Sequence, residues 1–456
     1  MEKLLTWIDE RFPLTKVWNE HLAQYYAPKN FNFWYFFGSL AVMVLVLQIV
    51  TGVFLTMHYK PDAERAFASV EYIMRDVPWG WLMRYMHSTG ASAFFIVVYL
   101  HMFRALLYGS HRGPRELVWI LGCVIFVALM AEAFMGYLLP WGNMSYWGAQ
   151  VIISLFDAIP YIGPGLAEWI RGDFNVSDAT LNRFFAFHVI LVPLVLVGLV
   201  FLHLVALHKV GSNNPDGVEI KKKKDKNGVP LDGIPFHPYY TVKDIVGVVV
   251  FLMLFAIVVF WAPEMGGFFL EHDNFAPANV LQTPPEIVPL WYFTPFYSIL
   301  RAVTDDMLRV MMVLIPALAL IVFVFSRTWA AKLGSVIVGI GLFAMLFILE
   351  AKVWGVFLMG WSIVLLFLLP WLDQSPVKSI RYRGWMYKTM LTLLVVSFFI
   401  LGYMGMKNPE HVDLFLFANV RWAQITTVVY FLFFLLLPFY SRWDSVQPEP
   451  DRVTFE

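Results

Sequence analysis

Cysteine and charge are both scarce in this chain of 456 residues. The single cysteine, Cys123, excludes disulfide bonds within the chain. Only 14% of the residues are charged, whereas 59% are hydrophobic and 18% are aromatic; a typical soluble domain carries about 25% charge. Basic and acidic residues number 33 each, so no charge excess indicates a nucleic-acid partner.

The N-terminus lacks the basic region, apolar core and cleavage site of a signal peptide. It carries instead a short amphipathic segment at 4–8, followed by lysines and several aromatic residues. We therefore expect residues 1–32 to lie in the membrane interface.

Long apolar runs make up most of the remaining sequence. A run of about 18 or more apolar residues is long enough to cross a bilayer as a helix. The sequence therefore predicts an all-α, polytopic membrane protein with about ten spanning helices. They are expected at 33–57, 81–107, 116–138, 184–208, 243–262, 307–326, 333–350, 353–370, 387–405 and 421–440.

Basic residues gather in alternate loops and so predict the orientation of the chain. The loop at 211–241 is rich in lysine, and the loop at 371–385 is also basic, whereas the loop at 263–303 has one arginine and several acids. By the positive-inside rule, both termini and the loop at 211–241 face the cytoplasm.

These features divide the chain into seven predicted segments. They are the interfacial segment at 1–32, a four-helix bundle at 33–210, a cytoplasmic loop at 211–241, a helix with an outer loop at 242–303, an extra helical hairpin at 304–351, C-terminal helices at 352–440 and a tail at 441–456.

Two of the apolar runs each contain two histidines about four helical turns apart. His87 and His101 are 14 residues apart, and His188 and His203 are 15 apart, with no charged residue in either interval. The predicted topology makes the two helices parallel. His87 then matches His188 in depth near the outer side, and His101 matches His203 near the inner side.

Four imidazoles at two matched depths predict a site for two haems, one above the other. A lone membrane histidine is more often a packed hydrogen-bonding residue, but ionisable groups at this depth are costly and usually serve a function. Two histidines per iron leave no open position, which suits electron transfer. Without a Cys-x-x-Cys-His motif, such haems must be non-covalent, of b type.

The 15-residue spacing leaves His203 about 60° out of line with His188 on a regular helix. Pro193 lies between them, and we expect a kink or bulge there to restore the alignment.

Glycines and arginines accompany the histidines. Glycine allows the close approach of a flat, bulky group, so glycines spaced 14 residues apart predict haem faces; the alternative is small-residue contact between helices. Arginines near each pair are expected to neutralise haem propionates, the alternative being interface arginines that reach toward the headgroups. The glycines are Gly38, Gly52, Gly122 and Gly136, and the arginines are Arg84 and Arg183 near the outer pair and Arg104 near the inner pair.

Several longer motifs resemble those of cytochrome b in the respiratory quinol–cytochrome c oxidoreductase (bc1) complex, bacterial type. The resemblance is dense over residues 1–303 and looser over 353–440. It implies that His87 and His188 hold a low-potential haem, and that His101 and His203 hold a high-potential one. The motifs are Thr-Gly at 51–52, Met-His-Tyr at 57–59, Ala-Phe-Met-Gly-Tyr-Leu-Leu-Pro-Trp-Gly at 133–142, Ala-Ile-Pro-Tyr-Ile-Gly at 158–163, Arg-Phe-Phe-Ala-Phe-His at 183–188, Gly-Ser-Asn-Asn-Pro at 211–215 and Phe-His-Pro-Tyr-Tyr at 236–240.

The resemblance also implies two quinone sites. The outer, quinol-oxidising site would use Phe134, Met135, Tyr137, Gly148 and Tyr292. At the inner, quinone-reducing site, His208 and Asp244 are a titratable pair that can supply protons, the alternative being hydrogen bonding at the interface. The inner residues are Ser39, His208, Ser212, Asn213, Lys243 and Asp244.

Two departures from the family pattern stand out. The Pro-Glu-Trp-Tyr motif appears here as Pro289-Leu290-Trp291-Tyr292, so the carboxylate credited with accepting a quinol proton is missing. We expect Glu132 or Glu286 to take this role, with Glu132 slightly favoured. Residues 304–351 are additional to the usual eight-helix pattern and predict an added hairpin.

The expected function is quinol oxidation at the outer site and electron transfer through two b haems to quinone at the inner site, coupled to proton translocation. The resemblance implies a Rieske iron–sulfur protein and cytochrome c1 as partners, in a dimeric complex in the bacterial cytoplasmic membrane. The alternatives are a di-haem ferric or ascorbate-type reductase, which would not need the loop at 263–303, and a haem or solute transporter, whose inverted repeats are not seen here.

Overall fold

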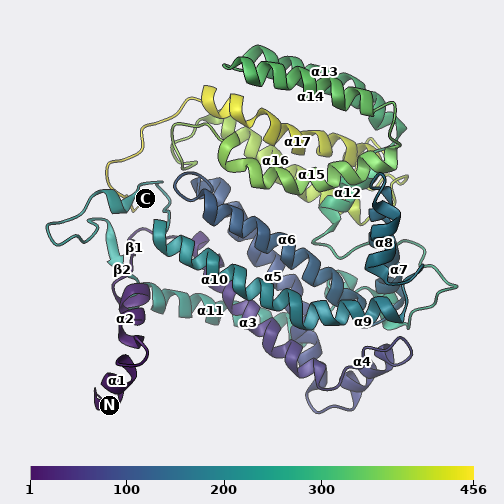
Figure 1. The fold of residues 1–456 in the computed structure, drawn as a ribbon, viewed down its shortest axis with the longest axis horizontal. Coiled ribbons are helices and arrows are strands. Elements are labelled where there is room, and N and C mark those ends of the chain that lie inside the picture. Colours follow the sequence, from purple (N-terminus) through teal and green to yellow (C-terminus); the bar gives the residue numbers. More distant parts are fainter. Residues whose placement is uncertain (1, 456) are drawn as a thin grey trace.

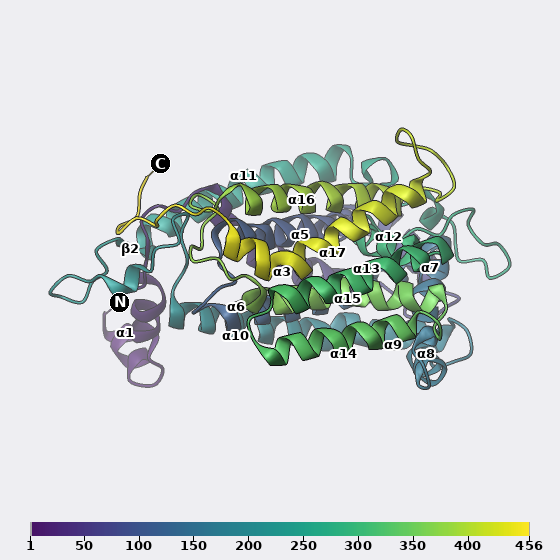
Figure 2. The ribbon, with the colours of Figure 1, turned by 90° about the horizontal axis from the view of Figure 1, so that it is seen from above.

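The computed structural model describes residues 2–455; residues 1 and 456, at the outer ends of the first and last predicted segments, lie outside it. Long helices lie side by side along one common direction, with the loops gathered at the two ends (Figures 1 and 2). Within residues 2–455, nine helices are long and apolar enough to cross a membrane. They are α3 (Phe36–Thr56, preceded by a 3-10 turn at Phe33–Tyr35), α5 (Gly80–Tyr108), α6 (Glu116–Leu138), α9 with α10 (Asp178–Val210), α11 (Phe236–Trp261), α13 (Asp305–Phe325), α15 (Ala351–Leu372), α16 (Trp385–Gly405) and α17 (Asn419–Trp443).

The remaining elements are short and lie at the ends of the bundle. Two strands pair antiparallel, with Tyr26 opposite Pro235, and join the N-terminal segment to the start of α11. The short elements are α1 (Glu2–Asp9), α2 (Leu14–Trp18), β1 (Tyr26–Pro28), α4 (Ala66–Arg75), α7 (Asn143–Ser154), α8 (Gly163–Arg171), β2 (Gly233–Pro235) and α12 (Thr294–Ala302).

About ten spanning helices were expected, and within residues 2–455 the structure has nine that are long and apolar enough to cross a membrane, together with one shorter apolar helix. That helix, α14 (Trp329–Met345), has 17 residues, at the lower end of the range of about 17–25 for a spanning helix. The expected span at 333–350 included residues 346–349, but these form a turn in which Leu346 is buried in a cluster with Trp354. The predicted hairpin itself is present, because α13 and α14 lie antiparallel beside α15 and α17 (Figure 1).

The N-terminal bundle consists of two helix pairs. Helix α3 packs along α5, α6 packs along α10, and α11 covers α3 and α5 from outside. Helices α5 and α10 run in the same direction, because Asn213, just beyond the end of α10, donates a hydrogen bond of 2.7 Å to the carbonyl of Tyr108 at the end of α5. The histidine-bearing helices are therefore parallel, as the topology predicted.

A π-helical turn removes the mismatch in histidine spacing. Helix α9 (Asp178–Ala186) is followed by the π turn Phe187–Leu191 and then by α10 (Val192–Val210). A π turn accommodates one more residue than an α turn, so 15 residues here advance about as far as 14 in α5. The predicted bulge is confirmed, and it lies just before Pro193.

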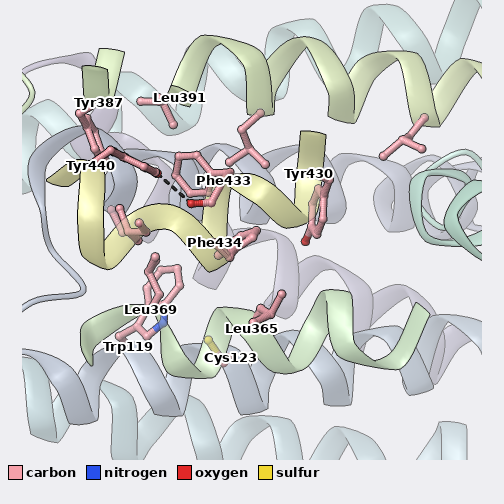
Figure 3. Packing of buried hydrophobic residues seen from close by; sticks show 14 of the residues in the cluster. Trp119, Cys123, Leu365, Leu369, Tyr387, Leu391, Tyr430, Phe433, Phe434 and Tyr440 are labelled. Atoms are coloured by element: carbon pink, nitrogen blue, oxygen red, sulfur yellow. Dashed lines mark hydrogen bonds between the residues drawn. The ribbon is translucent and has the colours of Figure 1, made fainter. Parts of the chain in front are cut away.

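The C-terminal helices pack through aromatic side chains onto α5 and α6. Lipid tails are as apolar as leucine, so helices in a membrane associate through close packing and hydrogen bonds. Figure 3 shows Tyr387, Phe433, Phe434 and Tyr440 interleaved in this core, where Tyr440 donates a hydrogen bond of 2.9 Å to the carbonyl of Phe433. Trp119 of α6 donates one of 2.6 Å to the carbonyl of Leu366 in α15. The C-terminal helices thereby hold the N-terminal bundle in place.

Candidate functional site

The four histidines meet in the two predicted pairs. The ring centroids of His87 and His188 are 6.1 Å apart, with the rings perpendicular. Those of His101 and His203 are 6.4 Å apart, at 61°. Two imidazoles on opposite sides of one metal would have centroids roughly 6 Å apart, given metal–nitrogen bonds of about 2 Å. Both pairs therefore have the separation that a shared metal requires.

Hydrogen bonds to Nδ1 orient both histidines of the outer pair. The hydroxyl of Thr51 donates to the Leu47 carbonyl at 2.8 Å and lies 2.9 Å from His87 Nδ1, from which it accepts. His188 Nδ1 lies 2.9 Å from the Glu132 carbonyl and 3.1 Å from the Glu132 carboxylate. In both rings Nε2 remains for a metal, and such partners fix the tautomer of a ligating histidine.

The inner pair has a different environment. Within the described part of the chain, His101 Nδ1 and Nε of Arg104 are buried without a hydrogen-bond partner, whereas His203 interacts with the backbone of Val118. The Arg104 guanidinium lies over the Tyr35 ring, 4.9 Å from its centroid. A buried donor without a partner is costly. An acidic group of a bound cofactor would accept a hydrogen bond from Nε of Arg104.

Each of the four glycines faces a histidine ring. A Cβ added to Gly52 would lie 3.3 Å from Cε1 of His87, and one added to Gly136 only 2.3 Å from Cε1 of His188. Gly38 and Gly122 face His101 and His203 in the same way, at 3.3 and 3.5 Å. Each of these glycines thus allows close approach of an imidazole from the neighbouring helix, and the expected haem faces stay a prediction.

A cavity of about 510 Å³ surrounds the outer pair. Its lining includes His87, His188, Gly52 and Gly136, together with Arg84. Cofactor sites typically have volumes of about 300–1,000 Å³. No group of three or more His, Cys, Asp or Glu in residues 2–455 is arranged to hold a metal ion. The residues present fit a haem.

The arginines divide according to their distance along the helix from a histidine. Arg84 and Arg104 each lie three residues from a histidine, about 60° away around the helix, and so share its face. Arg183 lies five residues before His188, about 140° away; it is exposed and donates to the Trp169 carbonyl. Its expected role at a haem propionate stays a prediction. Arg75, on the helix α4 that was not predicted, also lines the cavity.

A second, apolar pocket adjoins this cavity. Three predicted quinol-site residues, Phe134, Tyr137 and Gly148, line it together with Pro289 and Leu290. Tyr137 and Leu290 also line the histidine cavity, so the two spaces share a wall. Leu290, at the position of the missing glutamate, therefore lies between them.

The other two predicted quinol-site residues lie around this pocket. Tyr292 lines the histidine cavity and stacks on Phe95, with centroids 3.9 Å apart at 5°. The Tyr99 hydroxyl donates to the Tyr292 carbonyl at 2.5 Å. Met135 packs, partly buried, in a cluster at the outer end and lines neither space.

The two acids expected to replace the missing glutamate lie apart from the apolar pocket. Glu132 lines the histidine cavity and contacts His188. Glu286 is exposed, although its neighbour Ile287 lines the pocket. A third acid, Glu271, accepts a hydrogen bond of 2.8 Å from the Tyr137 hydroxyl. The sequence analysis counted Glu271 only as a charge of the outer loop, because 134 residues separate it from Tyr137.

The inner quinone residues form two small groups. His208 packs against Tyr25 with centroids 4.5 Å apart, and the Tyr25 hydroxyl lies 3.1 Å from the hydroxyl of Ser212. Ser39 faces Asp244. Tyr25 was not predicted; its only signal was its place among the aromatics of the N-terminal segment.

Two further predicted inner residues have contacts of their own. Asn213 is buried, and its amide donates to the Tyr108 carbonyl and to Ser110, which fixes the end of α10. Lys243 is exposed, and its ammonium group lies 5.4 Å from the Tyr240 ring centroid.

The parallel helices and paired histidines define a membrane-embedded protein suited to binding two metal cofactors. Comparisons with known proteins agree. The family described as Cytochrome b/b6/petB matches residues 22–211, and its C-terminal counterpart, Cytochrome b(C-terminal)/b6/petD, matches 277–336 and 340–431.

Full-length relatives are similar over nearly the whole chain. "Cytochrome b" of Allochromatium vinosum is 56% identical over 99% of this chain and 98% of its own length. "Cytochrome b" of Rhodospirillum rubrum is 44% identical over 99% and 96%. A solved structure, "Hyperthermophilic respiratory Complex III", has a TM-score of 0.77 and 34% identity, covering 96% of this chain and 98% of its own.

The chain therefore belongs to the cytochrome b family, as the cytochrome b of a bacterial bc1 complex (complex III). It is a multi-pass membrane protein and the catalytic subunit for quinol oxidation, with electron transfer through b haems. The match to the Allochromatium relative includes the hairpin α13–α14, so this segment is not peculiar to the present chain.

Proposed function

We propose that the two histidine pairs of this chain hold two non-covalent b haems, one near each side of the membrane. When bound, each haem supplies reversible one-electron transfer. The separations of the ring centroids, 6.1 and 6.4 Å, are the observation that carries this proposal. Nε2 of each histidine binds the metal, Thr51 and Glu132 orient the outer ligands, and Arg84 and Arg104 neutralise acidic groups of the cofactors.

The apolar pocket behind Leu290 is the proposed site of quinol oxidation. Phe134, Gly148 and Pro289 give it apolar walls that exclude water, and the shared wall brings a bound quinol next to the outer histidine pair. Exclusion of water strengthens each remaining polar contact. The phenol of Tyr137 is the proposed polar contact for a quinol hydroxyl.

Quinone reduction is proposed at the opposite end, near His208, Tyr25 and Asp244. These side chains lie where the N-terminal segment meets the start of α11 and the end of α10. A titratable pair at an interface can pass protons from the aqueous phase to a reduced quinone. We place this end on the cytoplasmic side, together with both termini, because the basic loop at 211–241 lies there.

The proposed partners are a Rieske iron–sulfur protein, which receives one electron from quinol, and cytochrome c1, in a dimeric complex in the bacterial cytoplasmic membrane. What supports them is membership of a complex III family.

Haem content tests the ligand assignment. The purified complex is expected to carry two b haems per copy of this chain, and His188→Ala and His203→Ala each to carry one. Retention of two haems in either variant would contradict the assignment.

A further inference from the structure

The quinol pocket has no carboxylate in its lining. Its two hydroxyl groups belong to Tyr137 and Tyr297. The Tyr297 hydroxyl donates to the Ile287 carbonyl at 3.3 Å. A backbone carbonyl is not a base and does not take up a proton. The Tyr137 hydroxyl donates to Oε2 of Glu271 at 2.8 Å. Tyr137 is therefore the only lining residue whose hydroxyl is hydrogen-bonded to a base.

Glu271 lies between this pocket and the surface. Its side chain is partly buried, whereas the next two residues, His272 and Asp273, are exposed. The titratable or charged groups that face it are Asp273 on its own loop, Tyr137 on α6 and Tyr292 after the Pro-Leu-Trp motif. No basic side chain is among them, so no cation locks Glu271 in its ionised form.

We propose that Glu271, acting through Tyr137, receives the proton of quinol oxidation that the missing glutamate of the Pro-Glu-Trp-Tyr motif would otherwise take. The inference rests on the proposed quinol pocket. It assigns Glu271 as a relay residue behind Tyr137, which is the group that touches the substrate.

The proton balance of the step is simple. Oxidation of a quinol to a quinone releases two electrons and two protons. The electrons go to the electron carriers of the complex, one proton leaves toward the proposed iron–sulfur partner that takes one of the electrons, and the other proton enters the relay. As one quinol O–H bond breaks, its proton passes to the Tyr137 oxygen while the phenol proton passes to Oε2 of Glu271. Tyr137 ends in its original form, and Glu271 ends protonated. It then releases the proton to the aqueous phase beside His272 and Asp273.

The geometry separates Glu271 from the other two acids near the site. The Glu132 carboxylate is 3.1 Å from His188 Nδ1 and is used in orienting that ring. Glu286 is exposed to solvent and makes no side-chain contact with Tyr137 in the described part of the chain. Glu271 alone of the three is hydrogen-bonded to a residue that lines the apolar pocket.

The acidity of Glu271 suits the role. Burial raises the pKa of Glu271 to about 7, although its hydrogen bond from Tyr137 opposes the increase. A proton acceptor works best when its pKa is near the operating pH. The ionised form is the acceptor, so the rate of quinol oxidation should rise with pH through about 7 and then level off.

The test is the pH profile of quinol oxidation by the intact complex, with a water-soluble ubiquinol analogue as substrate. Glu271→Gln is expected to lower kcat by about 10²-fold at neutral pH, the usual contribution of a proton acceptor, and to abolish the rise through pH 7. Glu271→Asp keeps a carboxylate one methylene shorter and is expected to give an intermediate rate with the rise retained. Glu410→Gln changes an exposed acid on the loop between α16 and α17, and that loop lies at the same end of the bundle as α7 (Figure 2). It is the matched control and should behave as wild type.

A double-mutant cycle separates the relay from packing. Tyr137→Phe interrupts the same relay, so adding it to Glu271→Gln should slow the reaction little further. A wild-type profile in Glu271→Gln, or loss of the pH dependence in Glu132→Gln or Glu286→Gln instead, would overturn the proposal. The proposal would also be overturned if Glu271→Asp were as slow as Glu271→Gln, because Glu271 would then act through packing and not as a proton acceptor. Failure of the proposed function itself would appear in the wild type, as absent quinol oxidation or missing haem.

Discussion

The two histidine pairs differ in the side chains that contact their Nδ1 atoms. In the outer pair, the Thr51 hydroxyl contacts Nδ1 of His87, and the Glu132 carboxyl group contacts Nδ1 of His188. No carboxylate lies against His101 or His203 in the described residues. A carboxylate behind a ligating imidazole makes the ligand more basic and favours the oxidised metal. The protein thus places a side-chain carboxyl group beside only one of its two histidine pairs.

This asymmetry predicts a selective shift in redox potential. Glu132→Gln replaces the carboxyl group beside His188 with an amide of the same shape. The reduction potential of the outer haem should rise by roughly 60 mV, which corresponds to a tenfold change in the equilibrium constant of a one-electron reduction. The potential of the inner haem should not change. Potentiometric titration of the complex measures both. A shift in the inner haem, or in neither, would contradict the proposed role of Glu132 at His188.

Of the four glycines, Gly136 leaves the least room for a side chain. An added Cβ would lie 2.3 Å from Cε1 of His188, whereas one at Gly122 would lie 3.5 Å from Cε1 of His203. We expect Gly136→Ala to displace His188 and remove the outer haem, and Gly122→Ala to retain both haems. Haem content and the reduced absorption spectrum distinguish these outcomes. Equal haem loss in the two variants would show that haem binding does not depend on the space that each glycine leaves for the imidazole ring.

At this scale, sequence patterns revealed residues that repeat along one helix. The four histidines and four glycines follow such a period, and all eight meet as pairs. Glu271 and Tyr25 were missed because their partners are 134 and 187 residues away, on other elements. No period along the chain encodes a contact between a loop and a distant helix.

Among the elements, the helix ends depend on buried ionic contacts. Asp373, just after α15, lies 3.0 Å from Nε2 of His111 in the loop between α5 and α6, and 2.5 Å from Arg383 before α16. All three side chains are fully buried. Burial opposes ionisation of the carboxyl, but the Arg383 guanidinium and His111 hold the pKa of Asp373 well below its usual range. This cluster ties the N-terminal bundle to the C-terminal helices.

Asp373→Asn is expected to destabilise the protein by about 3–5 kcal/mol, because Arg383 would be left buried without its partner. A lowered pKa means that the stabilisation is complete above the unfolded value of about 3.9 and is lost only as the pH falls below it. The difference in stability between Asp373→Asn and the wild type should therefore be constant from pH 5 to pH 8, as measured by thermal unfolding of the complex. Glu10→Gln, which breaks an ion pair with side chains 55% and 63% exposed, is the control and should leave Tm unchanged. An equal effect of the two substitutions would refute the role of the cluster.

The order, type and approximate ends of the helices followed from hydropathy, because spanning helices must be both apolar and long. Two features required the structure. The π turn at Phe187–Leu191 was expected from the 15-residue spacing only as an unspecified bulge near Pro193. Helix α14 was expected to extend to residue 350 but ends at Met345, because hydropathy alone cannot separate the end of a helix from the apolar turn that follows it.

For the whole molecule, the loops at the two ends differ in charge. The lysine-rich loop lies at the same end as both termini, and the acidic loop at 263–303 lies at the other (Figure 1). By the positive-inside rule, we propose that the quinol pocket faces the outer side and the His208 group faces the cytoplasm. Proton release outside and uptake inside would follow from that orientation.

Labelling of introduced cysteines tests the orientation. The native Cys123 is buried and should not react. A membrane-impermeant thiol reagent added to intact spheroplasts should label Val412→Cys, on the loop between α16 and α17, but not Lys224→Cys. After permeabilisation both should react, since both positions are exposed. The opposite pattern would invert the proposed topology.

The account depends most on the two histidine pairs holding separate haems at different depths. Potentiometric titration of the b-haem absorption in the purified complex, with His188→Ala and His203→Ala beside the wild type, tests this directly. Moving a negative charge inward against the membrane potential costs about 2.3 kcal/mol per 100 mV, so the inner haem should have the higher potential. We expect two one-electron components in the wild type, loss of only the lower-potential component in His188→Ala and loss of only the higher-potential one in His203→Ala. A single component in the wild type, or the reverse assignment in the variants, would contradict the account.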